Sequence, residues 1–346
     1  MTALATSAQP GSSAANPRPV PWTRLIWVTW RQHRAALAGV AALLGGLALY
    51  LLVTGLKIRG AYAGVTACRP ARSLSCQAVT ASFDDGYHAT AQTIAGLLQV
   101  VPVLVGVFAG APLLARELET GTFRFAWTQG CGRTRWVTVK LILLAATLAG
   151  AAYAFSLLFS WYYQPFFAER ADGELAPQLF DLRGVDFAAW TLVAFALGAF
   201  AGVLVRRTVP AIAASLAAWT GLDLVTALFL RKHYQPPLTG RSSSATGASG
   251  SHVPWVVSQW WTGPGGHQAS QGTIRALAQS APSSVQNAKV DTALTQWLGR
   301  RGYTQWMSYQ PESRFWHFQL IEGGWLLALA LLLATATVLL VRDRAA

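Results

Sequence analysis

A short charged segment between two long apolar runs holds residues whose types and spacing could do chemistry. It begins at Arg116 and ends at Trp136, and it contains two glutamates, Glu117 and Glu119, followed by a Thr-Gly-Thr turn at 120–122. Charged groups are costly inside a bilayer, so this segment belongs on the water side of a membrane, where it suits a contact with another protein. The alternative is an ordinary membrane-flanking loop whose arginines meet lipid phosphates. The residues alone favour neither.

The motifs of common catalytic and metal sites are absent from the sequence. It contains no Gly-x-x-x-x-Gly-Lys-Ser/Thr loop, which cradles nucleotide phosphates in P-loop ATPases. It also contains no His-Glu-x-x-His, Cys-x-x-Cys or Gly-x-Ser-x-Gly. We therefore expect that this chain is not an enzyme by itself and binds no cofactor and no metal.

Two polar residues within apolar runs are candidates for a substrate pathway. Asp223 is the stronger one, because a carboxylate at the centre of a membrane helix costs about 2.5–3.5 kcal/mol on insertion scales and should face protein or water. It could contact a substrate or a proton, or it could be a structural group bonded to Thr220 or Thr226. Gln99 is a weaker candidate. Glu322 is expected to meet headgroups or the outer loop.

Composition and the length of the apolar runs place the chain in a membrane. Of its 346 residues 53% are hydrophobic and 12% charged, whereas soluble domains carry about 25% charged residues. Six runs reach the roughly 20 residues that a helix needs to cross a hydrocarbon core of about 30 Å. Continuous apolar runs favour helices over the alternating strands of a barrel, so we expect an all-α integral membrane protein. The spans are Ala35–Leu56, Thr93–Leu114, Val137–Phe159, Phe187–Val205, Val209–Leu230 and Leu320–Val341.

Composition also divides the rest of the chain. Residues 1–21 are rich in Ala, Ser and Pro and should be disordered. Residues 22–34 carry aromatic residues at helical spacing beside arginines, which indicates an amphipathic interfacial helix or, alternatively, the water-side end of the first span. Pro102 and Pro112 should kink the second span. Spans one to five occupy 35–230, with the charged loop at 115–136. A large outer loop follows at 231–319, with short helices expected near 272–279 and 291–298. Span six and the tail occupy 320–346.

Arginines near the spans predict the orientation. They gather before the first span, in the segment 115–136, between spans four and five, and after span six, and six spans place all four regions on one side. The positive-inside rule assigns that side to the cytoplasm, so we expect a multi-pass plasma-membrane protein with both termini cytoplasmic. The loop 231–319 is then extracytoplasmic. The formal net charge of +13 reflects mostly this topology together with the basic outer loop, and it does not indicate nucleic-acid binding.

Cys68 and Cys76 lie eight residues apart in the first outer loop. A disulfide is plausible there in an oxidising compartment, and two unpaired thiols are the alternative. The third cysteine, Cys131, falls on the cytoplasmic side and should stay reduced.

Two motifs resemble one known family. The run Glu-x-Glu-x-Gly-Thr from Glu117, then Thr-Gln and Arg-x-Arg-Trp-x-x-x-Lys, resembles the first cytoplasmic loop of ABC-2 type transporter permease subunits from actinobacteria. The ending Tyr-Gln-Pro-x-Ser-Arg-Phe-Trp-x-Phe-Gln-x-Ile-Glu, from Tyr309 to Glu322, is similar to the outer segment before the last span in the same group. The resemblance runs from about Trp22 to the C-terminus, and its motifs name the family but not the cargo.

The resemblance implies a permease subunit of an ATP-driven exporter. Such a subunit pairs with a second permease chain, as a homodimer or heterodimer, and binds two copies of a separate cytoplasmic ATPase that holds the ATP and Mg²⁺. Closure of the ATPase would push on the charged loop and rock the spans, moving a substrate that is hydrophobic or amphipathic. Arginines in the loop would support the contact or meet lipid. By motif match the contact would involve Glu117, Glu119, Gly121, Thr122, Arg133 and Arg135.

Two other functions compete with this one. A membrane-anchored ligand-binding or sensory protein would use the loop 231–319 to recognise its ligand. A proton-coupled carrier would use Asp223, although the sequence shows no second buried charge and no repeat symmetry of the kind that carriers have.

Overall fold

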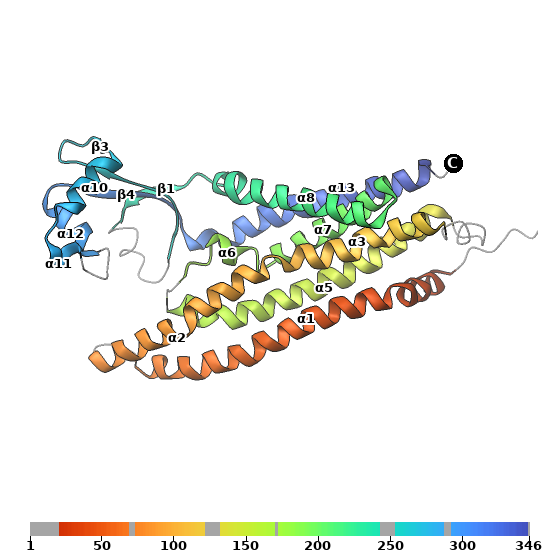
Figure 1. The fold of residues 1–346 in the computed structure, drawn as a ribbon, viewed down its shortest axis with the longest axis horizontal. Helices are drawn as coiled ribbons and strands as arrows, with labels where there is room; N and C mark the ends of the chain where they lie inside the picture. Colours follow the sequence, from red (N-terminus) through yellow and green to blue (C-terminus); the bar gives the residue numbers. More distant parts are fainter. Residues whose placement is uncertain are drawn as a thin grey trace, which may run out of the picture.

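Long helices lie side by side in a bundle, and a small α/β domain projects from one end of it (Figure 1). The structure is a computed structural model that describes residues 21–68, 73–121, 132–169, 172–242, 253–286 and 292–344. Six helical stretches among these residues are long and apolar enough to cross a membrane. The prediction of an all-α integral membrane protein with six spans is therefore confirmed for the bundle.

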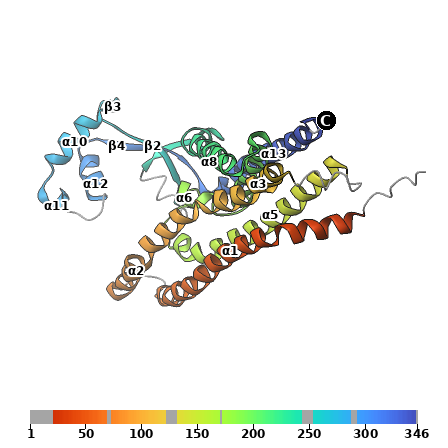
Figure 2. The ribbon, with the colours of Figure 1, turned by 45° about the vertical axis from the view of Figure 1, so that its right-hand side comes forward.

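The six spans alternate in direction along the bundle, and α2 and α3 together form one of them (Figure 1). One end of the bundle, which we call the loop end, holds the end of α3, the turn at 206–207 and the C-terminal end of α13 (Figures 1 and 2). The α/β domain lies at the opposite end, which we call the domain end. The bundle helices are α1 (Trp22–Ala67), α2 (Leu74–Leu98), α3 (Val101–Thr120), α5 (Arg133–Ala168), α7 (Asp186–Val205), α8 (Thr208–Val225) and α13 (Phe315–Arg344). Shorter pieces are α6 (Pro177–Phe180), the π-helical turn η1 (Thr226–Leu230), and the 3-10 turns η2 (Arg231–His233) and η3 (Glu312–Arg314).

The first helix, α1, is continuous over 46 residues. At 1.5 Å per residue it extends about 69 Å, well beyond a hydrocarbon core of about 30 Å. No Gly or Pro falls between Trp22 and Ala35, so no residue there breaks a helix. Residues 22–34 are therefore the first part of α1, which agrees with the alternative that they form the water-side end of the first span. The disordered tail expected over 1–21 lies, apart from Pro21, outside the described residues.

The second span is interrupted at the position where the sequence predicted a kink. Helix α2 ends at Leu98 and α3 begins at Val101, with Pro102 in the first turn of α3. Proline lacks an N–H, and its ring clashes with the carbonyl four residues earlier, here that of Leu98, so a regular helix cannot continue through it. Pro112, by contrast, lies inside α3.

Glycines bring α3 and α7 into close contact at the centre of the bundle. Gly106 and Gly110 of α3 face the backbone of α7, and Gly198 and Gly202 of α7 face the backbone around Ala111. A Cβ added at Gly198 would lie 2.6 Å from the Ala111 nitrogen, and one at Gly202 would lie 2.8 Å from the Ala111 oxygen. Small residues four apart on both helices are a common means of packing helices within membranes, where no hydrophobic force drives them together.

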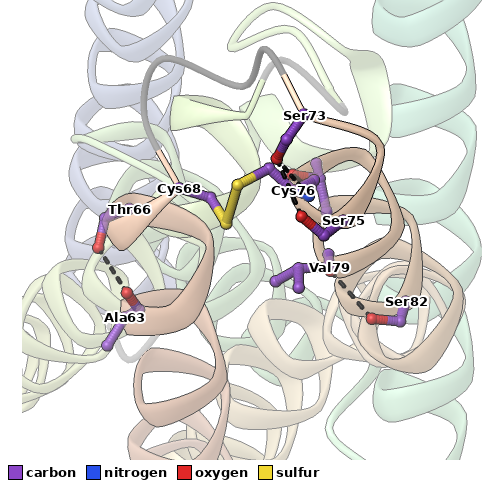
Figure 3. The surroundings of a disulfide bond; sticks show 9 residues. Ala63, Thr66, Cys68, Ser73, Ser75, Cys76, Val79 and Ser82 are labelled. Carbon is purple, nitrogen blue, oxygen red and sulfur yellow. Dashed lines mark hydrogen bonds between the residues drawn. A yellow bond between two sulfur atoms is a disulfide. The ribbon is translucent and has the colours of Figure 1, made fainter.

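A disulfide between Cys68 and Cys76 joins the end of α1 to the start of α2 (Figure 3). Their Cα atoms lie 5.3 Å apart, a usual spacing for a disulfide. Ser73 caps α2, because its hydroxyl accepts a hydrogen bond of 3.3 Å from the backbone N–H of Cys76. The bridge therefore closes the turn between two long helices at the domain end.

The α/β domain contains a four-stranded antiparallel sheet, which the all-α prediction did not include. Its longest strand, β2, carries tryptophans on both faces, so the apolar–polar alternation that marks a strand is missing from the sequence. The predicted helices near 272–279 and 291–298 agree with α10 and α12. The elements are β1 (Leu238–Arg241), β2 (Trp255–Thr262), β3 (Gln268–Ala269), α10 (Gln271–Gln279), α11 (Ser283–Gln286), α12 (Thr292–Arg300) and β4 (Thr304–Gln310), with sheet order β1-β4-β2-β3.

Candidate functional site

The predicted partner contact begins where α3 ends. Gly121 has a φ of +71°, a left-handed conformation that glycine adopts without strain, and it ends the helix where the Thr-Gly-Thr sequence predicts a turn. Thr122 lies outside the described residues. The helix α5 starts at Arg133, whose side chain is also outside them, and Arg135 is half-buried in the first turn of that helix. The roles of these residues in a contact stay predictions.

Glu117 reaches from α3 to α5. Its Oε1 lies 2.5 Å from Nζ of Lys140, which is buried, and the same Nζ lies 3.9 Å from the ring centroid of Trp136. A buried ammonium group needs an anionic or aromatic partner, since burying an isolated charge is costly. The ion pair therefore fixes the end of α3 against α5.

Glu119 reaches from α3 to α8. Its Oε2 accepts hydrogen bonds from the backbone N–H of Thr208 at 3.2 Å and from the Thr208 hydroxyl at 2.9 Å. The first N–H groups of a helix have no partner within the helix, and the helix dipole favours an anion there. The two glutamates singled out in the sequence thus connect α3 to two other spans at the loop end.

A buried ionic cluster at the domain end was not predicted from the sequence. The guanidinium of Arg231 donates from Nε to Oε2 of Glu322 at 2.9 Å and from Nη2 to Oε1 at 2.6 Å, and it also pairs with Asp181. Oε1 of Glu322 accepts a further hydrogen bond of 3.2 Å from the indole N–H of Trp190. Of the two expectations for Glu322, headgroups or the outer loop, the structure agrees with the second, because a two-pronged contact with Arg231, the first residue of 231–319, holds this carboxylate inside the protein.

Two more carboxylates border this cluster. Asp186, the first residue of α7, is fully buried, and one oxygen each from Asp181, Asp186 and Glu322 lie within 4.8 Å of one another. Neither oxygen of Asp186 has a hydrogen-bond partner among the described residues. Asp223 is half-buried and interacts electrostatically with Arg231 and Glu322. The statement that the sequence offers no second buried charge beside Asp223 is therefore corrected.

The electrostatics of the cluster disfavour full ionisation. Asp181 lies in the segment of the chain that connects α5 to α7. Burial raises the pKa of its carboxyl to about 7. Arg231 acts in the opposite direction, and the Glu322 carboxylate adds to the rise. The guanidinium of Arg231 therefore offsets only part of the negative charge that surrounds it.

Gln99 occupies the break between α2 and α3. Its side-chain amide donates a hydrogen bond of 2.7 Å to the backbone oxygen of Gln178 in α6. This contact accounts for a polar residue at the position without any substrate. A role for Gln99 in a substrate pathway stays a prediction.

A comparison with protein families decides the class of this molecule. A model of a family described as ABC-2 membrane transporter related matches residues 41–231, which is more than half of the chain. The match runs from within the first span to near the end of the fifth and includes both loop-end glutamates. The chain belongs to the ABC-2 membrane transporter related family. Membership confirms the resemblance to ABC-2 type permeases, so this is a multi-pass transmembrane permease.

The match to the ABC-2 membrane transporter related family ends at Arg231, so the α/β domain lies outside it. No curated protein and no solved structure matches the chain.

Proposed function

We propose that this permease is the membrane-spanning subunit of an ATP-driven exporter whose ATPase is a separate chain. Family membership supports a partnership with an ABC ATPase in general. The observation that carries the proposal is the position of Glu117 and Glu119, which lie at the start of the loop 115–136 and contact α5 and α8. An ATPase that pressed on residues 115–136 would act where three spans meet.

The contacts of α3 offer a route for transmitting such a force. Lys140 connects α3 to α5, Thr208 connects it to α8, and the glycine-mediated packing connects it to α7. Tightly packed helices shift as bodies more readily than they deform. A push on the loop would therefore tilt α3, α5, α7 and α8 together, which is the motion that alternating access requires.

An apolar groove supports the proposed class of substrate. It lies between α1 and α5, has a volume of about 450 Å³, and is lined by residues such as Leu44, Leu148 and Phe155. Such a lining suits a hydrophobic or amphipathic molecule. The direction of transport, outward, follows from the family resemblance.

The rest of the proposal concerns assembly and location. Two permease chains would pair, as a homodimer or heterodimer, and bind two ATPase copies that hold the ATP and Mg²⁺. This chain would not hydrolyse ATP itself. The loop end and both termini would face the cytoplasm from the plasma membrane, by the positive-inside rule.

Site-specific cross-linking tests the proposal. A photo-cross-linking amino acid at Arg116, which is exposed at the loop end, should trap an ATP-hydrolysing chain in native membranes. The matched control is the same group at Asp84, which is exposed in α2 at the domain end and should trap no such chain. Mass spectrometry of the adducts identifies the partner. The proposal fails when Arg116 captures no ATPase, or when both positions capture it equally.

A further inference from the structure

The carboxylates buried at the domain end outnumber the cations that neutralise them. Asp181 is 8% exposed, and Asp186 and Glu322 are 0% exposed. Arg231, 1% exposed, is the cation that the described part of the chain places in contact with them. When all three carboxylates are ionised, they and the one guanidinium carry a net charge of −2, and an excess of this size is expensive away from water.

Asp186 is the member of the cluster that lacks a partner. The hydrogen bonds of Arg231 go to Glu322 and Asp181, and within the described residues both oxygens of Asp186 have none. Nη1 of Arg231 is buried and also without an acceptor among those residues. A buried group of this kind needs an explanation, because most buried polar atoms in native proteins are paired.

We propose that Asp181, Asp186 and Glu322 bind a divalent cation of the size of calcium. A charge of +2 balances the excess of −2, whereas one proton or one monovalent ion would leave half of it. Calcium binds oxygen ligands at about 2.3–2.6 Å, so ligand atoms up to 4.8 Å apart fit around it. Magnesium, at about 2.1 Å, requires a tighter set. This proposal departs from the expectation, drawn from sequence motifs, that no metal binds.

The cation would hold together elements that are distant in the sequence. Asp181 lies in the connection before α7, Asp186 begins α7, and Glu322 lies in α13. Arg231, at the end of the fifth span, fixes Asp181 and Glu322 by hydrogen bonds and leaves Asp186 for the ion. The site is far from the loop end and does not depend on the proposed ATPase contact.

Direct binding to the full-length protein, purified in detergent, tests the proposal. Equilibrium dialysis against ⁴⁵Ca²⁺ should find about one bound ion per chain, and Ca²⁺ should raise the unfolding temperature above its value in EGTA. Asp186→Asn should weaken binding at least about tenfold and abolish the shift. Asp84→Asn, which removes an exposed carboxylate at the same end, should leave both unchanged.

Stability in EGTA separates loss of the ligand from loss of the fold. Asp186→Asn removes an unpartnered charge, so in EGTA it should be at least as stable as the wild type. Asp181→Asn is a second ligand variant that keeps the Arg231–Glu322 contact, and it should also bind Ca²⁺ more weakly. The proposal is overturned when the wild type binds no Ca²⁺, or when both variants bind it as the wild type does. If Ca²⁺ leaves the unfolding temperature of the wild type unchanged while Asp186→Asn is more stable than the wild type, a bound proton on Asp186 replaces the cation as the explanation.

Discussion

Arg231→Met should destabilise the protein far more than the loss of an ordinary basic side chain. Methionine keeps most of the apolar stem and removes a guanidinium that is 1% exposed. The variant leaves Glu322 and Asp181 buried without their cation, beside Asp186, which has no hydrogen-bond partner among the described residues. The loss of stability therefore measures the cost of uncompensated buried charge.

The structure indicates the size of the effect. Removing one partner of a buried ion pair costs about 3–5 kcal/mol. The Arg231 guanidinium makes three hydrogen bonds to carboxylates and lies 4.7 Å from the ring centroid of Phe180. Proton uptake by a stranded carboxyl limits the penalty, because a protonated acid is cheaper to bury than its anion. We expect a loss of about 3–5 kcal/mol at pH 8.

Reversible denaturant unfolding in detergent, with EGTA present, is the assay. The control is Lys232→Met, a neighbouring cation whose side chain is only half-buried, and its effect should stay within about 0.5 kcal/mol. Glu322→Gln added to Arg231→Met should recover part of the loss, because an amide needs no counter-ion. A loss below about 1 kcal/mol for Arg231→Met, or a double variant that loses the sum of both single effects, would refute this account of the cluster.

Three further predictions follow from the loop end, the helix packing and the cysteines. Glu119→Gln should retain the ATPase partner but lower its permease-dependent stimulation several-fold in an ATPase assay, while Asp343→Asn, an exposed carboxylate at the same end, should not. Gly198→Leu should cost at least about 1–3 kcal/mol in unfolding, because it overpacks the α3–α7 contact. Gly221→Ala, which meets open space, should cost nothing and gain up to about 1 kcal/mol of helix stability. Thiol titration of the denatured, unreduced chain should count one free thiol, and Cys68→Ser should raise the count to two; three thiols in the wild type would contradict the bridge.

The spans were predictable because apolar length is a local property of the sequence. The fifth span was expected at Val209–Leu230, and the helical stretch runs over Thr208–His233. The break at Pro102 was equally local, since proline acts on the preceding turn. The sequence left open whether 22–34 form a separate helix or the start of α1, because amphipathic spacing near a membrane fits both.

The ionic cluster could not be predicted, because no local pattern joins its members. Arg231 is 50 residues from Asp181 and 91 from Glu322, and each of the three resembles a charge that flanks a span. The loop-end glutamates were found by their spacing, yet their partners stayed hidden for the same reason. Lys140 lies 23 residues from Glu117, and Thr208 lies 89 from Glu119.

The small sheet places a mechanical restriction on the spans that enter and leave it. Strand β1 follows the fifth span after four residues, β4 precedes the sixth by one, and the two strands pair from Leu238↔Tyr309 to Arg241↔Trp306. This strand pairing and the Arg231–Glu322 contact hold the two spans together at the domain end. They can then separate there only by breaking the pairing of β1 with β4, so in any movement of the two spans that end would act as a hinge. Displacement about a hinge grows with distance from it, and these two spans would part most widely at the loop end.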